Sequence, residues 1–246
     1  MRCISPSIRS QINSEKDRLM NETHYHVRKR KMIYKFLSAE SNKHSAAIEF
    51  PDGTRLSGKD AVNYAAENLA RSHNTFCSLY RGELNRDLIF DVWESLMPDF
   101  KPKKFRTSSD GFCRPKYSAH AYPSNVSREL ELFMVENNSI KDALDKAFHA
   151  HLHLLRIHPF LDGNGRLGRV IQNGILLSDD YPPLMIHKKD RSDYMDLIEK
   201  AQTSYEYHDR RKTRKQTEFY NYLAMNLWCS LKRAREMVEE KQKTLD

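Results

Sequence analysis

Glycine and proline are scarce in this chain of 246 residues, which contains 8 and 9 of them. So few turn-forming residues favour a helical protein over a turn-rich all-β fold. The 4 cysteines (Cys3, Cys77, Cys113 and Cys229) lie far apart and form no Cys-x-x-Cys pair. This spacing argues against a zinc site or a disulfide framework and predicts free thiols in a reducing compartment.

Long apolar segments are absent as well. No apolar run reaches about 18 residues, so we expect no membrane span. The N-terminal residues lack the apolar core of a secretory signal, which predicts a cytoplasmic protein, although export without such a signal stays open.

The composition is that of a folded domain, because 39% of the residues are hydrophobic and 30% are charged. The net charge of +8 fits a phosphate-bearing ligand, nucleic acid, an anionic membrane or solubility alone. The basic clusters Arg28–Lys31 and Arg210–Lys215 are the only features that suggest nucleic acid, and a solvated helical face is the commoner explanation of such runs. We therefore expect neither nucleic acid nor a membrane as a partner.

Apolar residues recur at helical spacing along most of the chain. The pattern predicts helices over residues 59–69, 84–96, 127–137, 140–157, 165–175 and 192–205, and a further helix through Tyr222 and Leu227. Residues 101–123 show no helical stripe and are typical of an irregular loop or a hairpin around Asp110-Gly111. The sequence therefore predicts an all-α domain with one irregular insertion, preceded by an N-terminal helical extension.

The segment HPFLDGNGRLGR, from His158 to Arg169, concentrates the candidate chemistry. Four of the 8 glycines fall between Gly163 and Gly174. A helix must end near His158, because Pro159 disfavours the α region for the residue before it. A new helix begins about Gly165, and its unpaired N-terminal amides form a site for an anion.

The charged residues of this segment suit nucleotide chemistry. Arg166 and Arg169 lie on one face and can donate to phosphate oxygens; without an anion they would oppose the helix dipole. Asp162 is a lone carboxylate of the kind that binds Mg²⁺ beside phosphates, and His158 titrates near neutral pH and can act as a general base. A lone histidine is more often structural and Gly-Asn-Gly alone is only a turn, so the combination carries the inference. We assign Phe160, Leu167 and Val170 to the core. Together these parts suit the attack of a hydroxyl on a nucleotide phosphate.

The same segment resembles the signature of the Fic family at every specified position, and Ala147 and His151 resemble the run-up to it. The resemblance covers roughly residues 40–205. It implies a Fic-fold helical bundle with a short β-hairpin flap at about 105–123. We divide the chain into an N-terminal helical extension (1–40), a Fic domain (41–205) and a C-terminal basic helical segment (206–246).

The resemblance implies protein adenylylation, in which AMP passes from ATP to a Ser, Thr or Tyr hydroxyl of a target protein and pyrophosphate leaves. The target would dock on the flap. Gln202 stands where some family members place an asparagine at the base, which departs from the pattern. The implied roles are catalytic base for His158, Mg²⁺ ligand for Asp162, anion hole for Gly163, Asn164 and Gly165, phosphate binding for Arg166 and Arg169, and base binding for Tyr194.

A second resemblance concerns regulation. Ser45-x-x-x-Glu49, in a helix expected at about 38–50, resembles the family's inhibitory motif, whose glutamate pairs with the second motif arginine, here Arg169. Phe50 departs from the glycine or asparagine of that pattern, and an ordinary helix end with an exposed glutamate is the alternative. The expectation is a self-inhibited enzyme. Removal of AMP and formation of a homodimer stay open.

Three alternatives remain at this point. A Doc-like kinase would transfer the γ-phosphate, but such kinases depart from the Gly-Asn-Gly-Arg present here. Another nucleotide donor, giving UMP or phosphocholine transfer, is compatible with a motif that does not read the base. A non-catalytic basic binding module would have retained the loop as a relic.

Overall fold

The computed structural model describes residues 3–24, 27–49, 59–107, 110, 125–203 and 213–243, and in these ranges the ordered elements are helices. They are α1 (Pro6–Glu22), α2 (Val27–Glu49), α3 (Lys59–Leu79), α4 (Arg86–Leu96), α5 (Val126–Ser139), α6 (Ala143–Ile157), α7 (Asn164–Ser178), the short 3-10 helix η3 (Lys188–Asp190), α8 (Arg191–Thr203) and α9 (Arg214–Lys243). The prediction of an all-α protein is confirmed for these residues. None of their helices is long and apolar enough to cross a membrane.

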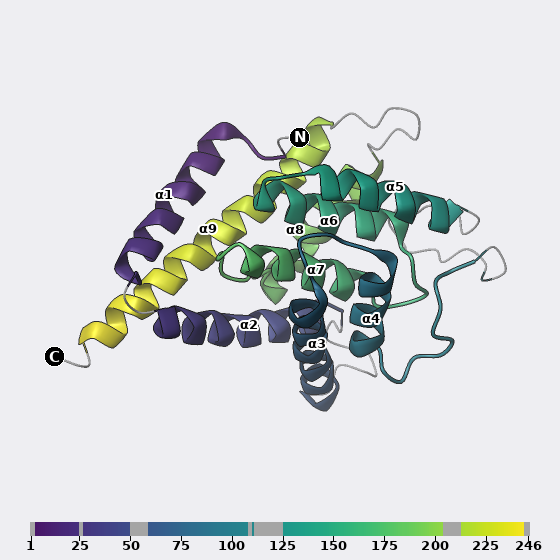
Figure 1. The fold of residues 1–246 in the computed structure, drawn as a ribbon, viewed down its shortest axis with the longest axis horizontal. Coiled ribbons are helices and arrows are strands. Elements are labelled where there is room, and N and C mark those ends of the chain that lie inside the picture. The colour runs from purple at the N-terminus through teal and green to yellow at the C-terminus, as the bar shows by residue number, and fades with distance from the viewer. Residues whose placement is uncertain are drawn as a thin grey trace.

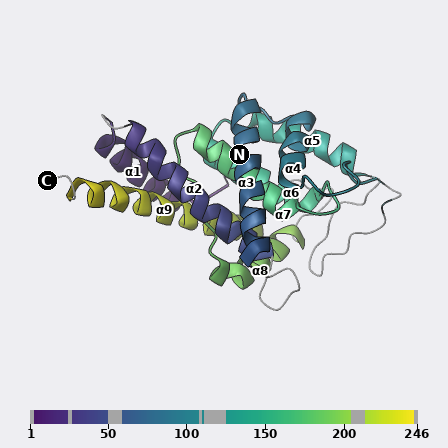
Figure 2. The same ribbon diagram turned by 90° about the horizontal axis from the view of Figure 1, so that it is seen from below.

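The helices form two neighbouring groups, which Figure 1 shows in one view. Helices α3, α4 and α5 pack against the central pair α6 and α7. Helices α1, α2 and α9 extend to one side, where α9 lies along α1 and also contacts α2. Helix α2 joins the groups, because it contacts α9 and also α3 and α7; Figure 2 shows it crossing towards α3.

Helices α6 and α7 are buried almost all round. Every residue of α6 from Leu144 to Ile157 is buried, and α7 is buried from Arg166 to Leu176. A helix enclosed in this way is held mainly by packing, so the loop that joins these two helices is flanked on both sides by buried structure. Phe160, Leu167 and Val170 are fully buried, as the sequence predicts.

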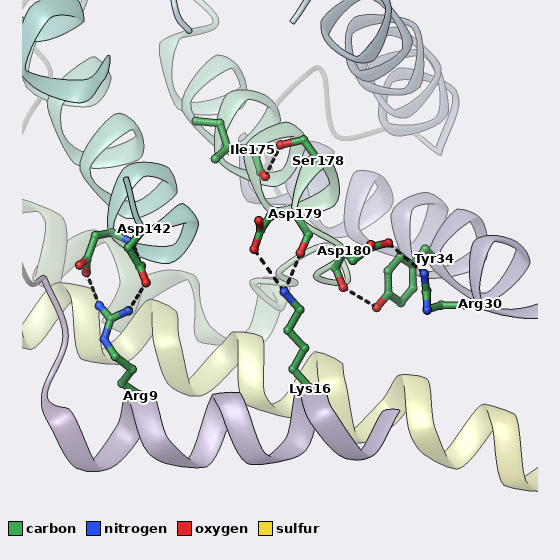
Figure 3. A network of polar contacts seen from close by, with 10 residues as sticks. Arg9, Lys16, Arg30, Tyr34, Asp142, Ile175, Ser178, Asp179 and Asp180 are labelled. Atoms are coloured by element: carbon green, nitrogen blue, oxygen red, sulfur yellow. Dashed lines mark hydrogen bonds and ion pairs between the residues drawn. The ribbon is translucent and has the colours of Figure 1, made fainter. Parts of the chain in front are cut away.

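Polar contacts fix the first helix to the ends of α6 and α7 (Figure 3). The Arg9 guanidinium donates at 2.6 Å to the carboxylates of both Asp142 and Asp145, at the start of α6. The Lys16 ammonium donates to the backbone oxygen of Asp179 at 2.7 Å and to its carboxylate at 3.2 Å. The N-terminal helix is therefore joined to the helices that carry the motif.

The N-terminal half of α2 is also anchored to the residues that follow α7. Asp180, with a positive φ of 58°, accepts from the Arg30 guanidinium at 3.1 Å and, through its backbone oxygen, from the Tyr34 hydroxyl at 3.0 Å. Lys29 donates to the backbone oxygen of Val238 on α9 at 3.0 Å. Part of the basic cluster Arg28–Lys31 thus serves packing, which leaves less of it to bind a polyanion.

Several boundaries differ from the sequence prediction. Helix α3 continues to Leu79 instead of ending at 69, because buried polar residues such as Ser72 and His73 interrupt its apolar stripe without interrupting the helix. Helix α6 begins at Ala143 and not at 140, since Asp142 caps it by accepting from the Asp145 amide at 2.9 Å. Most of the flap predicted at 105–123 lies outside the described residues; 105–107 and 110, which are described, contain no strand.

Candidate functional site

The motif loop (residues 158–163) begins where α6 ends. His158 is the C-cap of α6 in the left-handed conformation, with φ 52° and ψ 60°, and its amide donates to the Leu154 oxygen at 2.9 Å. A left-handed backbone at a residue other than glycine costs energy, so it persists only where neighbours enforce it. Arg106 is such a neighbour: its Nε donates to the His158 oxygen at 2.6 Å, and its own amide donates to the Pro159 oxygen at 2.8 Å. Arg106 therefore holds the backbone at His158 and Pro159 in place.

Aromatic packing holds the middle of the loop. The Phe160 ring stacks on Trp93 of α4, with centroids 4.2 Å apart and planes 2° apart, and on Phe105 at 4.8 Å. The Asn164 side chain accepts from the Phe160 amide at 3.0 Å and donates to the Phe160 oxygen at 2.8 Å. Asn164 thus closes the loop with its side chain, and only its backbone amide can face an anion.

Gly163 and Asp162 form the turn into α7. Gly163 has φ 82°, and a Cβ there would lie 2.9 Å from Met97 Cγ and 3.2 Å from Trp93 Nε1, so both conformation and space require glycine. Trp93 Nε1 donates to the Asp162 backbone oxygen at 2.9 Å. This leaves the Asp162 side chain at the surface, where it is 60% exposed and 3.7 Å from Arg166.

Arg169, one turn into α7, is enclosed by groups that arrive from α2. Its Nε donates to the Ser45 hydroxyl at 2.7 Å, and one terminal nitrogen donates to the Ser45 backbone oxygen at 3.2 Å. The same terminal nitrogen forms an ion pair with Glu49 at 2.6 Å. The structure therefore brings together Ser45, Glu49 and Arg169, which lie more than a hundred residues apart in the sequence.

A chain of hydrogen bonds through Tyr194 and His151 orients the Arg169 guanidinium on the side away from Ser45. Its other terminal nitrogen donates to the Tyr194 hydroxyl at 3.3 Å, and that hydroxyl is 2.8 Å from His151 Nε2. His151 Nδ1 faces the Gln172 side-chain oxygen, which can only accept, so His151 carries its proton on Nδ1 and Tyr194 donates to Nε2. Burial, followed by the charge of Arg169, lowers the pKa of His151 to about 3 against the effect of the Gln172 bond. The His151 ring is therefore neutral, as its hydrogen bonds with Gln172 and Tyr194 require.

The electrostatic surroundings keep Glu49 ionised. Burial favours the neutral carboxyl, but Arg169 and Arg166 outweigh it, and the pKa of Glu49 lies below its usual value. Its carboxylate also lies against the start of α7, because a Cβ on Gly165 would be 2.6 Å from Glu49 Oε1. A fixed negative charge therefore occupies the neighbourhood of the helix N-terminus and its two arginines.

A cavity of about 320 Å³ opens beside these groups. The predicted residues His158, Gly165, Arg169, Tyr194 and Glu49 contribute to its wall. The opposite wall is α8, from Arg191 to Gln202. Tyr194 is fully buried and Gln202 nearly so, and both form part of this wall. The other predicted residues, Asp162, Gly163, Asn164 and Arg166, lie in the motif loop and the first turn of α7 and do not form part of the cavity wall.

Three residues that position the site were not predicted from the sequence. Arg106 and Trp93 act through contacts with the backbone of the motif loop, across 52 and 69 residues of sequence, and no local pattern signals such contacts. Arg191, in contrast, has a feature that can be seen in the sequence. It is the first residue of α8, where a cation opposes the helix dipole. The same conflict singled out Arg166 and Arg169, so it could have indicated Arg191 too.

A separate cluster of Glu136, His149 and His153 has the composition of a metal site, with its candidate ligand atoms within 4.8 Å of one another. The Asn137 side-chain nitrogen, which can only donate, lies 3.2 Å from His149 Nδ1 and also donates to the Lys146 oxygen. His149 therefore accepts at Nδ1 and carries its proton on Nε2, the atom 4.0 Å from Glu136. A protonated nitrogen has no lone pair for a metal, so the hydrogen bonding of His149 argues against a metal site at this cluster.

Residues 83–176 match the Fic/DOC family. A protein named protein adenylyltransferase Fic from Drosophila melanogaster is 41% identical over 66 residues, which are 27% of this chain and 13% of the relative. The protein of the same name from Nematostella vectensis is 32% identical over 83 residues, 32% of this chain and 19% of the relative. The chain thus matches less than a fifth of the length of these curated relatives.

Solved structures agree over a much larger part of the chain. A Fic domain containing signaling protein from Bacteroides thetaiotaomicron aligns with a TM-score of 0.74 and 20% identity, covering 94% of this chain and 97% of that one. Fic-1 from C. elegans aligns with a TM-score of 0.72 and 18% identity, covering 95% of this chain and 73% of that one. At such identities these likenesses concern the fold, and they confirm the predicted Fic-fold bundle. The chain therefore carries a Fic/DOC family domain, matched by residues 83–176, within a fold shared with Fic proteins.

Proposed function

We propose that this chain is a protein adenylyltransferase that transfers AMP from ATP to a hydroxyl of a target protein, and that Glu49 restrains it. The observation that carries the proposal is the position of the Glu49 carboxylate, against Gly165 at the start of α7 and in an ion pair with Arg169. A carboxylate oxygen is a stand-in for a phosphate oxygen, because both accept from guanidinium groups and from helix N-termini. The names of the curated relatives support the same reaction.

The α-phosphate and the phosphates beyond it would bind at the start of α7. The amides there lack intrahelical partners, and Gly165 has no Cβ on the side where the Glu49 carboxylate lies. Arg166 and Arg169 would neutralise the charge that develops on the leaving oxygens. Because Tyr194 fixes one side of the Arg169 guanidinium, that group needs little reorganisation when it exchanges Glu49 for phosphate.

His158 would accept the proton of the attacking hydroxyl. Like Gly165, it lines the cavity, and its backbone oxygen is held by Arg106. In the reaction the hydroxyl oxygen of the target forms a bond to the α-phosphorus, and its proton passes to His158. The bond from the α-phosphorus to the bridging oxygen breaks, and pyrophosphate leaves with that electron pair.

Asp162 fits a magnesium ligand of the kind that shares the ion with a nucleotide. Its carboxylate is exposed, one oxygen accepts from the Gly163 amide at 2.6 Å, and the other is 3.7 Å from Arg166. One carboxylate together with phosphate oxygens and water is a common ligand set for Mg²⁺. The ion would supply charge neutralisation for the leaving pyrophosphate.

Gln202 favours a donor whose base carries an exocyclic amine. Its side chain is 2% exposed and lines the cavity, and its oxygen has no hydrogen-bond partner within the described part of the chain. A buried acceptor without a partner costs free energy that an adenine amine would recover, whereas uracil offers a carbonyl there. A bond from such an amine to Gln202 would favour ATP over a uridine nucleotide.

The test is to incubate the purified chain with ATP and Mg²⁺ and to measure its intact mass, beside His158→Ala. We expect the wild type to gain the mass of one or more adenylyl groups on hydroxyl side chains and His158→Ala to gain none. Gain of a phosphate mass would indicate a kinase instead, and equal modification of both proteins would remove His158 from the mechanism.

A further inference from the structure

A backbone oxygen close to the C-terminal bound of α2 accepts a hydrogen bond from a distant side chain. Helix α2 is described as far as Glu49, and the backbone oxygens near the C-terminal end of a helix carry partial negative charge. One of them, the Ile48 oxygen, accepts from Arg191 Nε at 2.7 Å. The residue that carries this donor lies 143 positions further along the chain.

Arg191 is the first residue of α8, at the positive end of that helix dipole. A cation is unfavourable there unless an acceptor compensates it. The end of α2 is that acceptor, since it offers both the Ile48 oxygen and the Glu49 carboxylate. Arg191 is half-buried between the two helices and contributes to lowering the pKa of Glu49.

The bond from Arg191 to α2 does not involve the Glu49 side chain, whereas one of the bonds from Arg169 does. Arg169 holds the Glu49 side chain, which it would exchange for phosphate, and it holds Ser45 one turn earlier in α2. Arg191 holds backbone, one residue before Glu49, and does so from α8, which also forms the far wall of the cavity. The last turn of α2 is therefore attached to both sides of the nucleotide cavity.

We propose that Arg191 is a positioning residue of the restraint: its bond to the Ile48 oxygen fastens the end of α2 across the cavity and keeps Glu49 opposite Arg169. This inference rests on the proposed function for its catalytic consequence, but the fastening itself is a property of the fold. A bond from a charged donor corresponds to roughly a tenfold to a hundredfold change in the local opening of the helix end.

The fastening is tested by amide hydrogen exchange of the full chain, which needs no nucleotide. In Arg191→Gln we expect the amides of residues 45–49 to exchange roughly tenfold faster or more, while those of α6 keep their wild-type rates. Lys189→Gln is the matched control, because it removes an exposed positive charge two residues away and should leave exchange unchanged. Arg191→Lys, which keeps a donor, should restore part of the protection. Wild-type exchange at 45–49 in Arg191→Gln would overturn the proposal.

The regulatory consequence is tested by a double-mutant cycle on automodification with labelled ATP. Arg191→Gln should raise the rate in the wild-type background, and this increase should disappear in the Glu49→Gly background, where no restraint remains. A loss of activity by the same factor in both backgrounds would overturn the proposal and make Arg191 a nucleotide-binding residue. If no variant, Glu49→Gly included, incorporated label, the proposed function would fail, while the exchange experiment would still decide whether Arg191 fastens α2.

Discussion

Glu49→Gly should convert the restrained protein into an active one. In the structure the Glu49 carboxylate pairs with Arg169 at 2.6 Å and lies against Gly165, so it occupies the place where a phosphate would bind. Nucleotide must displace this carboxylate before its phosphates can reach the arginine. Removing the side chain removes that competition and leaves the Ser45 and Tyr194 contacts of Arg169 intact.

The size of the effect follows from the kind of bond that is lost. A hydrogen bond between charged groups contributes about 1.5–3 kcal/mol, and the Glu49 side chain is 28% exposed, which favours the lower part of that range. Each 1.4 kcal/mol is a factor of ten, so productive binding of nucleotide should rise about tenfold, and by less than about a hundredfold.

The assay is the rate of automodification with ATP labelled in the α-phosphate. Glu40→Gly is the control on the same helix, because it removes a glutamate that forms no ion pair with Arg169 and places glycine in the interior of α2, where it destabilises the helix at least as much. We expect a rate increase in Glu49→Gly and none in Glu40→Gly. Equal rates in Glu49→Gly and the wild type would refute the idea that this carboxylate restrains the site.

Two further predictions concern stability. Asn164→Ala should lower the free energy of unfolding by about 2–4 kcal/mol in a denaturant titration, because the buried amide and oxygen of Phe160 both lose their partner; a loss below about 0.5 kcal/mol would show that the loop closes without them. Acid should also destabilise the fold. Burial lowers the pKa of His73 to about 4 and those of His149 and His151 to about 3, so the folded state binds fewer protons than the unfolded state below pH 6.5. Each should cost about 2 kcal/mol by pH 5, and stability that stays constant between pH 7 and pH 5 would contradict the burial of these neutral rings.

The sequence predicted the parts of the site that lie close together along the chain. Pro159 and the glycines located the loop between two helices, and the structure places the end of α6 at Ile157 and the start of α7 at Asn164. Local rules suffice here, because a proline and a left-handed glycine restrict the backbone whatever surrounds them.

Contacts between distant segments had no such local signal. The side chain of Asn164, a residue expected to line an anion hole, also bonds to the backbone of Phe160, and no sequence pattern predicted that contact. Arg106 and Trp93 reach the loop from other elements through backbone oxygens, which any sequence would offer. The meeting of Glu49 with Arg169 was expected from a family resemblance and not from spacing, since only tertiary packing of α2 on α7 brings them together.

The central claim is that the protein transfers AMP, and not the γ-phosphate, from ATP bound in the cavity beside His158. It is tested most directly by incubating Glu49→Gly and Glu49→Gly/His158→Ala with Mg²⁺ and ATP labelled either in the α- or in the γ-phosphate. We expect Glu49→Gly to retain the α-label and not the γ-label, and Glu49→Gly/His158→Ala to retain neither. Retention of the γ-label, or retention of the α-label without His158, would contradict it.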